Sequence, residues 1–187
     1  MNGLKTAGFV LSAALALYAC SKTPADIVVS DKGAGPVSLT TPFEAAEVGK
    51  LLEGYTVEAA ISSALQPGEK TIRVSKGDVT LVEFYPGANG TMVESALVLD
   101  AAVKDDKGIH IGSTFAEAMG SADASTCGTG RGEKAGRVFC PRAGSDHIIY
   151  EFQGTTPAPE GQVPPAAALA SWTVSSMLWD GSEPAPQ

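Results

Sequence analysis

The sequence is short of basic charge and of side chains that bind metal ions. Its 187 residues include 13 Lys and Arg against 21 Asp and Glu, which gives a formal net charge of −8. A nucleic-acid binder uses basic residues to neutralise phosphates, so this balance argues against nucleic acid as a partner. Only two histidines, His110 and His147, and three cysteines are present, which is too few for us to predict a metal site.

Catalytic and cofactor motifs are also absent from the sequence. There is no Gly-x-Ser-x-Gly elbow, and Ser145 and Asp146 are direct neighbours of His147, where side chains usually diverge rather than form a triad. The glycine-rich segment Gly128–Lys134 lacks the Gly-Lys-Ser/Thr of a phosphate-binding loop. We therefore predict no catalytic residue and no cofactor.

The first twenty residues have the organisation of a bacterial export signal. Lys5 supplies a positive charge, and Ala7–Leu17 is an almost wholly apolar run. This run is shorter than the roughly 20 apolar residues that span a bilayer. Leu17-Tyr18-Ala19-Cys20 matches a lipobox, where signal peptidase cuts before the cysteine, although Tyr18 is bulkier than usual at its position. We predict a lipoprotein signal peptide over residues 1–19, with an ordinary signal peptide and a chance cysteine as the alternative.

Cys20 then becomes the lipidated N-terminus of the mature chain. Two acyl chains on the sulfur and a third on the amine, palmitate among them, exceed the single chain that gives only marginal membrane binding. Ser21 and Lys22 follow the cysteine. An Asp at that place would hold a lipoprotein in the inner membrane, so its absence favours the outer membrane of a Gram-negative envelope, facing the periplasm. Residues 20–30 are predicted to be the lipidated N-terminus and a flexible tether.

The two other cysteines, Cys127 and Cys140, form an even pair in a predicted oxidising compartment. Disulfides persist in such compartments, whereas cytosolic thiols stay reduced. We therefore predict a disulfide between them, with two free thiols as the alternative. The spacing is not Cys-x-x-Cys, so we expect a structural and not a redox role.

Apolar periodicity and turn signals predict a single α+β domain over residues 31–180. Thr41, Pro42 and Glu44 have the spacing of a helix start with a capping box, and Gly54 marks the end of that helix. Four strand-like runs follow as an antiparallel meander: Tyr55–Ile61, Lys70–Ser75, Val79–Tyr85 and Met92–Leu99.

A similar pattern restarts in the second part of the chain. Ile109–Ile111 alternates like Val37–Leu39, and Thr114 with Glu117 predicts a capping box for a second helix, over Phe115–Met119. The remaining predicted elements are strands at Thr126–Cys127, Gly136–Pro141, His147–Phe152 and Trp172–Trp179, and a short helix at Ala166–Ser171. Two tandem strand-helix-meander halves, 31–104 and 105–180, would explain the pattern, and coincidence between two α+β segments is the alternative. Residues 181–187 are predicted to be a disordered tail.

Four basic side chains gather near the glycine-rich segment. Arg131, Lys134, Arg137 and Arg142 are accompanied by a single acid, Glu133. In an acidic chain such a cluster would meet the phosphates of anionic lipid headgroups or lipopolysaccharide. We predict an anion-binding patch, with a solvated loop as the alternative.

A family resemblance covers most of the mature chain and is most specific in its second half. It rests on Gly112 with Phe115, Cys127 with Cys140, Gly144-Ser145, His147-Ile148 with Tyr150, Phe152 with Gly154, Pro159-Glu160-Gly161 with Pro164, and Trp172 with Trp179. Residues upstream that also fit are Gly33, Gly35, Thr41-Pro42, Lys76-Gly77-Asp78 and Val98-Leu99-Asp100. With these residues the chain resembles the RpoE-regulated outer-membrane lipoproteins, a YfeY-like family. Gly112-Ser113-Thr114 departs from the family pattern, which has Thr-Pro there.

The resemblance implies a location more than an activity. The family is of unknown molecular function, is anchored in the outer membrane and is associated with envelope stress, and it supplies no catalytic residues to carry over. We expect a non-enzymatic binding or assembly accessory, held to the membrane by its lipid, with an envelope protein or an anionic lipid as partner. The alternative is an enzyme acting on envelope lipid or peptidoglycan, which would need acid and base groups with perturbed pKa values in a pocket.

Overall fold

The computed structural model describes residues 26–182, except residues 63, 66, 121–123 and 156. The predicted signal peptide, Cys20, the first part of the predicted tether and residues 183–187 of the predicted tail lie outside the described residues. Each helix within the described part of the chain is too short or too polar to span a bilayer.

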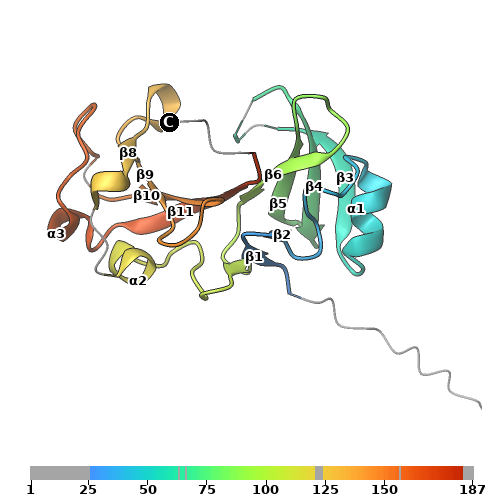
Figure 1. Cartoon of the computed structure of the whole chain (residues 1–187), viewed down its shortest axis with the longest axis horizontal. Helices are drawn as coiled ribbons and strands as arrows, with labels where there is room; N and C mark the ends of the chain where they lie inside the picture. The colour runs from blue at the N-terminus through green and yellow to red at the C-terminus, as the bar shows by residue number, and fades with distance from the viewer. Residues whose placement is uncertain (1–25, 63, 66, 121–123, 156, 183–187) are drawn as a thin grey trace, which may run out of the picture.

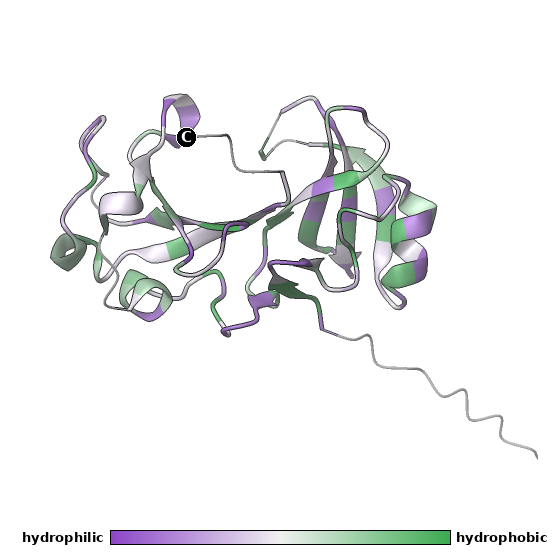
Figure 2. Cartoon of the chain, viewed as in Figure 1, coloured by the Kyte–Doolittle hydropathy of each residue, from purple (hydrophilic) through white to green (hydrophobic). Residues whose placement is uncertain are grey.

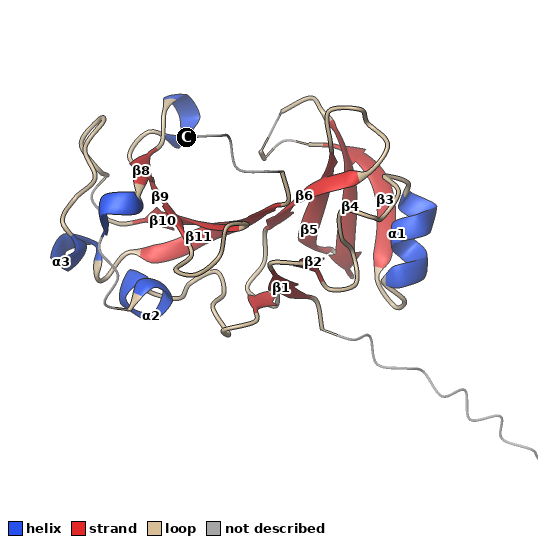
Figure 3. Ribbon diagram, viewed as in Figure 1, coloured by secondary structure: helices blue, strands red, loops and turns tan. Residues whose placement is uncertain are grey.

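One antiparallel sheet of eight strands crosses the molecule from β3 to β8, in the order β3-β4-β5-β6-β11-β10-β9-β8 (Figures 1 and 3). Its strands are β3 (Thr56–Ile61), β4 (Lys70–Lys76), β5 (Val79–Pro86), β6 (Val93–Val98), β8 (Gly128–Thr129), β9 (Val138–Pro141), β10 (Ile148–Gln153) and β11 (Thr173–Asp180). The helices are α1 (Ala45–Leu51), α2 (Phe115–Met119) and α3 (Ala166–Leu169), with 3₁₀ turns η1 (Ala124–Thr126) and η2 (Gly132–Lys134). The predicted antiparallel meander with a few helices is confirmed at this level.

The sheet consists of two four-stranded meanders. β3 to β6 form the first and follow α1, whereas β8 to β11 form the second and follow α2. The two meanders join where β11 pairs with β6, and there Met177 lies opposite Val98. The last strand along the chain therefore lies in the middle of the sheet, between β6 and β10.

One face of the sheet forms the hydrophobic core. A row of paired residues on this face crosses six strands, and all of them are buried: Val74, Val82, Val98, Met177, Tyr150 and Cys140. Successive residues of a strand point to opposite faces, so the adjacent row lies on the second face. Figure 2 shows the corresponding alternation of hydrophobic and hydrophilic residues along the strands of the first meander.

A smaller sheet packs against the core face. It contains β1 (Val28–Ser30), which pairs antiparallel with β2 (Gly33–Ala34) and parallel with β7 (Lys104–Asp105). Ile27 and Val29 belong to the core cluster together with side chains of the main sheet. The tether predicted for residues 20–30 is therefore wrong from Ile27 onward, because these alternating apolar residues are buried in the core.

The first helix starts later than predicted. Its N-cap is Glu44, which makes no capping hydrogen bond with its side chain. Residues 41–43 instead lie extended against residues 91–93: the N–H of Phe43 donates to the carbonyl oxygen of Thr91 over 2.8 Å. The Thr41 hydroxyl accepts the N–H of Ser38 at 3.1 Å. The predicted capping box is wrong here because tertiary pairing holds its residues in extended backbone.

The second helix is placed as predicted. The Thr114 hydroxyl accepts the N–H of Glu117 at 3.2 Å, and the Glu117 carboxylate accepts the N–H of Thr114 at 2.7 Å. This reciprocal pair is the capping box that the sequence predicts, and it starts α2 at Phe115.

Three short predictions fail in the loops. Ile109–Ile111 forms only an isolated bridge, because the Asp105 carboxylate accepts the N–H of Ile109 at 2.8 Å and turns the chain. Val37–Leu39 likewise contributes only a bridge at Val37. The strand predicted at Thr126–Cys127 starts one residue after it, as β8, because η1 precedes it.

The predicted tail also begins inside the folded body. Gly181 is buried, and its N–H donates to the carbonyl oxygen of Glu94 at 2.9 Å. The prediction of disorder from residue 181 is therefore wrong at Gly181, which extends the pairing between β11 and β6.

Candidate functional site

The second face of the main sheet carries two buried carboxylates. Glu83 lies in β5 and Glu151 in β10, which are the third strands of the two meanders. The row that contains Glu83 continues through Leu97 and Leu178 to Ile149, two residues before Glu151, so the two carboxylates share a face. A buried carboxylate is costly unless cations and hydrogen bonds compensate it, so the partners of each one decide its role.

Glu151 is 3% exposed and has four side-chain partners. Lys134 Nζ donates to its Oε2 at 2.9 Å, and Arg137 forms an ion pair with its Oε1. Ser175 Oγ donates to Oε1 at 2.8 Å, and Ser176 Oγ donates to Oε2 at 3.1 Å. Burial alone would raise the pKa of Glu151, but the hydrogen bonds from Lys134, Arg137 and Ser175 outweigh it and hold the pKa below its ordinary value.

A bulge in β11 brings both serines to one carboxylate. Ser176 lies opposite Glu151 and Val174 lies opposite Phe152, so Ser175 is the extra residue. In a bulge two residues of one strand oppose a single residue of its partner, which re-aims a side chain. The bulge therefore allows the hydroxyls of both Ser175 and Ser176 to donate to the carboxylate of Glu151.

Glu83 has a comparable set of partners. Arg73 donates to its Oε1 from Nη2 at 3.1 Å, and Tyr85 Oη donates to its Oε2 at 2.8 Å. Ser62 Oγ lies 2.6 Å from Tyr85 Oη and 3.2 Å from Glu83 Oε2. Burial, with the adjacent Glu83 carboxylate, raises the pKa of Tyr85 to about 12. Tyr85 therefore stays protonated at neutral pH and acts as a hydrogen-bond donor.

A third cluster joins the smaller sheet to the main sheet. Arg142, just after β9, is 3% exposed, and its guanidinium pairs with Asp31 at 3.2 Å, with Asp105 at 3.3 Å and with Asp106. The hydroxyl of Tyr150 donates to Asp105. Burial would lower the pKa of Arg142, but Asp106 and Asp105 raise it above its ordinary value. Burial and the Asp105 carboxylate raise the pKa of Tyr150.

The four predicted anion-binding residues are divided between different places. Arg142 belongs to the cluster with the three aspartates, and Lys134 and Arg137 meet at Glu151. Arg131, which precedes η2, is exposed. The prediction of one anion-binding patch is wrong for Arg142, because carboxylates from elsewhere in the sequence match its charge, and Lys134 and Arg137 share their charge with Glu151.

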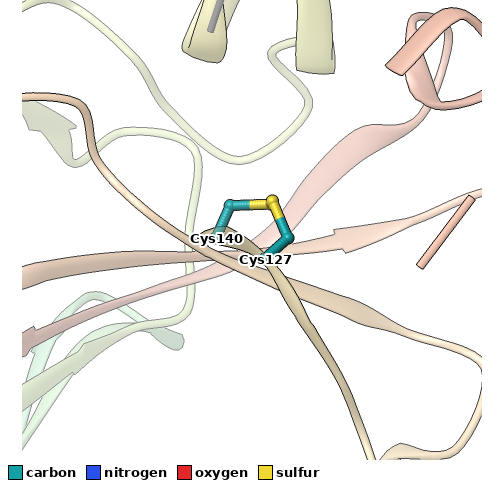
Figure 4. Close-up of a disulfide and its surroundings, with 2 residues drawn as sticks. All are labelled: Cys127 and Cys140. Atoms are coloured by element: carbon teal, nitrogen blue, oxygen red, sulfur yellow. A yellow bond between two sulfur atoms is a disulfide. The ribbon is translucent and has the colours of Figure 1, made fainter. Parts of the chain in front are cut away.

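The Cys127–Cys140 disulfide that the sequence predicts is present in the structure (Figure 4). It links the residue before β8 to buried Cys140 in β9. The segment between the two cysteines carries Lys134 and Arg137. The disulfide therefore fixes both ends of the loop that supplies the cations of Glu151.

Both histidine rings bind backbone carbonyl groups. His147 Nδ1 lies 2.8 Å from the carbonyl oxygen of Asp180, and His110 Nδ1 lies 2.9 Å from that of Ile111. The hydroxyl of Ser145, the nearest serine in sequence to His147, instead bonds the Asp31 carboxylate and accepts the N–H groups of His147 and Ile148. This arrangement gives the two rings structural roles in turns and strand ends.

An apolar groove of about 790 Å³ opens between the start of α1 and the end of β3. Small and aliphatic side chains dominate its lining, and the aliphatic ones include exposed Ile61 and buried Ile72. Two charged residues, Glu44 and Lys70, also line it. Its shape and composition suit an apolar side chain or an extended segment more than a polar metabolite.

The groove and all three polar clusters are absent from the predictions made from sequence. A signal for two of them exists, since Glu83 and Glu151 are charged residues inside strongly apolar strands, Val79–Pro86 and Ile148–Gln153. A charged residue in such a run is rarely buried without a partner. No sequence spacing, however, connects Arg142 with Asp31, more than a hundred residues away.

The chain has relatives in both sequence and structure. Residues 15–181 match a family described as "Protein of unknown function (DUF1131)". "Uncharacterized protein YfeY" of Escherichia coli strain K12 is 30% identical over 152 residues, which are 81% of this chain and 78% of YfeY. The crystal structure of the uncharacterized protein yfeY from Escherichia coli superposes with a TM-score of 0.65 at 29% identity, over 82% of this chain and 99% of that chain. From the extent of these matches we conclude that the chain is a homologue of YfeY and belongs to the DUF1131 family of proteins of unknown function.

Proposed function

We propose that this protein is a lipid-anchored, non-enzymatic binding or assembly accessory of the bacterial outer membrane, facing the periplasm and linked to envelope stress. The observation that carries the proposal is the lipobox Leu17-Tyr18-Ala19-Cys20 behind an apolar signal segment. A disulfide between Cys127 and Cys140 is compatible with an oxidising compartment such as the periplasm.

The partners of the buried ionisable groups support a binding role over a catalytic one. A catalytic acid or base is held ready in a cleft, with a pKa tuned to its task. Glu151 and Arg142 are each matched by several groups of opposite charge, and Tyr85 donates to Glu83. Such groups fix a fold, and they leave exposed surfaces, the apolar groove among them, for a binding role.

An enzyme acting on envelope lipid or peptidoglycan is the alternative function. The feature that would favour it is the hydroxyl pair of Ser62 and Tyr85 beside Glu83. With a raised pKa, Tyr85 is a poor base for activating Ser62 at neutral pH. Hydrolysis of a lipid or murein substrate that Ser62→Ala abolishes in a folded protein would establish the enzyme and overturn our proposal.

The anchor is tested by replacing Cys20 with Ala. Wild-type protein should incorporate labelled palmitate and sediment with the outer membrane, because several acyl chains, each contributing about 0.8 kcal/mol per buried CH₂, hold it there. Cys20→Ala should lose the label and appear in the soluble periplasm or as uncleaved precursor. Ser21→Ala is the matched control and should behave as wild type. A Cys20→Ala protein that sediments with the outer membrane would rule the anchor out.

A further inference from the structure

The two edges of the main sheet differ in length and in exposure. At one edge, β8 has two residues and is tied down by the neighbouring disulfide. At the other edge, β3 has six residues, and several of them are exposed. A long edge strand presents unpaired backbone groups to any chain that approaches it, so β3 is the edge to which another strand can add.

The register shows which groups of β3 point away from the sheet. The N–H of Ser62, just beyond β3, donates to the carbonyl oxygen of Glu69 on the β4 side. In an antiparallel ladder, residues that bond to the partner strand alternate with residues that do not. Continuing the register from Ser62, the backbone groups of Ala60, Glu58 and Thr56 face β4. Those of Val57, Ala59 and Ile61 therefore face outward, and no backbone partner engages them among the described residues.

The groove begins at the end of this edge strand. Residues 59–61 of β3 line it together with their paired residues 70–72 of β4, so the groove extends from the edge strand over the end of its neighbour. Ala45 and Ala46 of α1 line it as well. Ile61 is 59% exposed, the largest exposure among the exposed large hydrophobic side chains of the described chain. The outward backbone groups of β3 and the apolar lining of the groove are thus close enough to bind one ligand together.

Acidic side chains outnumber basic ones around the edge, where Glu47 and Lys50 of α1 pair with each other. Glu44 and Glu53 are exposed at the two ends of α1, and the side chain of Glu58, in the middle of β3, is 58% exposed. Arg73 lies 3.8 Å from Glu58 but also bonds Glu83, so its charge is shared. Among the described residues, Lys70 is the one cation that lines the groove. This balance favours an approaching strand with basic side chains, and it disfavours a second copy of this chain, which would bring a second acidic edge.

We propose that the outer edge of β3 and its groove bind an extended, basic polypeptide segment, which adds to the main sheet as a strand. Its backbone pairs with Val57, Ala59 and Ile61, an apolar side chain enters the groove, and a Lys or Arg lies beside Glu58. Backbone pairing supplies affinity in this mode of recognition, and alternate side chains supply specificity. The inference rests on the proposed function, since it names the class of partner that the binding accessory would hold.

A synthetic peptide of alternating lysine and valine is the probe, titrated into the purified full-length protein and followed by calorimetry. We expect saturable binding by the wild type and at least a tenfold weaker affinity for Ala59→Pro, which removes an outward N–H while leaving the ladder to β4 intact. The same peptide with an N-methyl group on every residue should not bind, because neither of its edges can then donate to β3. Val79→Lys, which removes an exposed apolar side chain from the β4–β5 turn, is the matched control and should bind as wild type.

Glu58→Lys supplies a second variant that changes no backbone group. It should weaken binding of the lysine peptide and allow binding of a glutamate–valine peptide. Absence of binding to the wild type, equal binding by Ala59→Pro, or equal binding of the N-methylated peptide would each overturn the inference. Fractionation of the same variants separates the two proposals: Ala59→Pro should still sediment with the outer membrane, so loss of peptide binding leaves the anchor untouched.

Discussion

Glu151 ties the stability of the second meander to pH. Its carboxylate is buried among Lys134, Arg137, Ser175 and Ser176, and its pKa is lowered in the folded protein. A lowered folded pKa gives a stabilisation that is complete above the unfolded pKa of about 4.3 and is lost as the pH falls through the folded pKa. The negative charge of Glu151 thus stabilises the fold at neutral pH and not in acid.

We expect Glu151→Gln to lower the free energy of unfolding at pH 7 by about 3 kcal/mol, because it leaves two cations without their buried partner. The difference from wild type should shrink as the pH falls below about 4, where the wild-type carboxylate also becomes neutral. Urea unfolding at neutral and acid pH measures both effects. Glu133→Gln, in an exposed position of the same loop, is the control. A deficit that is the same at both pH values would contradict the prediction.

Tyr85 gives the opposite dependence on pH. Its pKa is raised to about 12 in the folded protein. Its contribution to folding stability is therefore complete below the pKa of the unfolded state and is lost as the pH rises toward the pKa of the folded state. We expect Tyr85→Phe to cost about 1–2 kcal/mol at neutral pH, since Glu83 loses a donor. Above the unfolded tyrosine pKa of about 10, the wild type should lose stability faster than the variant. Parallel urea midpoints for the two proteins through the alkaline range would count against this role.

The sequence could predict single residues only where their partners are near in the chain. Thr114 and Glu117 are three residues apart and form the capping box that their spacing predicts. Arg142 looked like part of a basic loop because Asp31, Asp105 and Asp106 are distant in sequence and adjacent only after folding. The same limit explains why the sequence predicts that Lys134 and Arg137 meet anionic headgroups and does not predict their pairing with Glu151.

At the level of elements, the disulfide hairpin is the clearest unit. Cys127 and Cys140 close a loop of sequence separation 13 that contains η2 and carries both cations of Glu151. Closing a loop of this size lowers the entropy of the unfolded chain. In the chain-entropy account this stabilises the folded protein by about 3 kcal/mol. The loop is rich in glycine, which loses much backbone freedom on ordering, so the bond supports a segment that is costly to order.

We expect the double variant Cys127→Ala, Cys140→Ala to unfold at lower urea concentration, with a loss of about 2–4 kcal/mol. Thiol labelling of the oxidised, folded wild type should find neither cysteine reactive, and reduction should expose both and lower the melting temperature. Two reactive thiols before reduction would contradict the structure. A melting temperature that reduction leaves unchanged would contradict the stabilising role.

Strands were easier to predict than the segments between them. β3 to β6 follow the predicted runs closely because each alternates in hydrophobicity and is bounded by turn residues. The start of α1 was not predictable from residues 41–44 alone, since pairing with residues 91–93 overrides a local helix signal. The joining of two meanders through β11 and β6 is likewise a long-range choice that local patterns do not contain.

At the scale of the whole molecule, Arg142 connects three parts of the chain. Its carboxylate partners lie in the β1–β2 turn, in β7 and just after β7, while Arg142 itself follows β9. The cluster therefore holds the smaller sheet against the second meander. Loss of the cation would leave several carboxylates close together without compensation.

We expect Arg142→Met to destabilise the protein by about 3–5 kcal/mol and to release β1 before the rest of the fold. Hydrogen exchange should then become faster at the amides of Val29 and Ser30 than in the central strands of the main sheet. Arg131→Met, which removes an exposed cation, is the control. It should change neither the free energy of unfolding nor the hydrogen exchange of β1. Uniformly faster exchange throughout the chain would contradict the connecting role.

The central position of β11 governs the order in which the chain can fold. A polypeptide leaves a ribosome or a translocation channel from its N-terminus onward, so β3 to β6 emerge well before β11 does. Until Thr173–Asp180 arrives, β6 has no partner on one side and β10 has none on the other, although each belongs to the middle of the finished sheet. Both strands are then exposed edges, open to proteases and to wrong pairing. The nascent chain of this protein should consequently stay open to proteolysis and misassembly until its final strand is delivered.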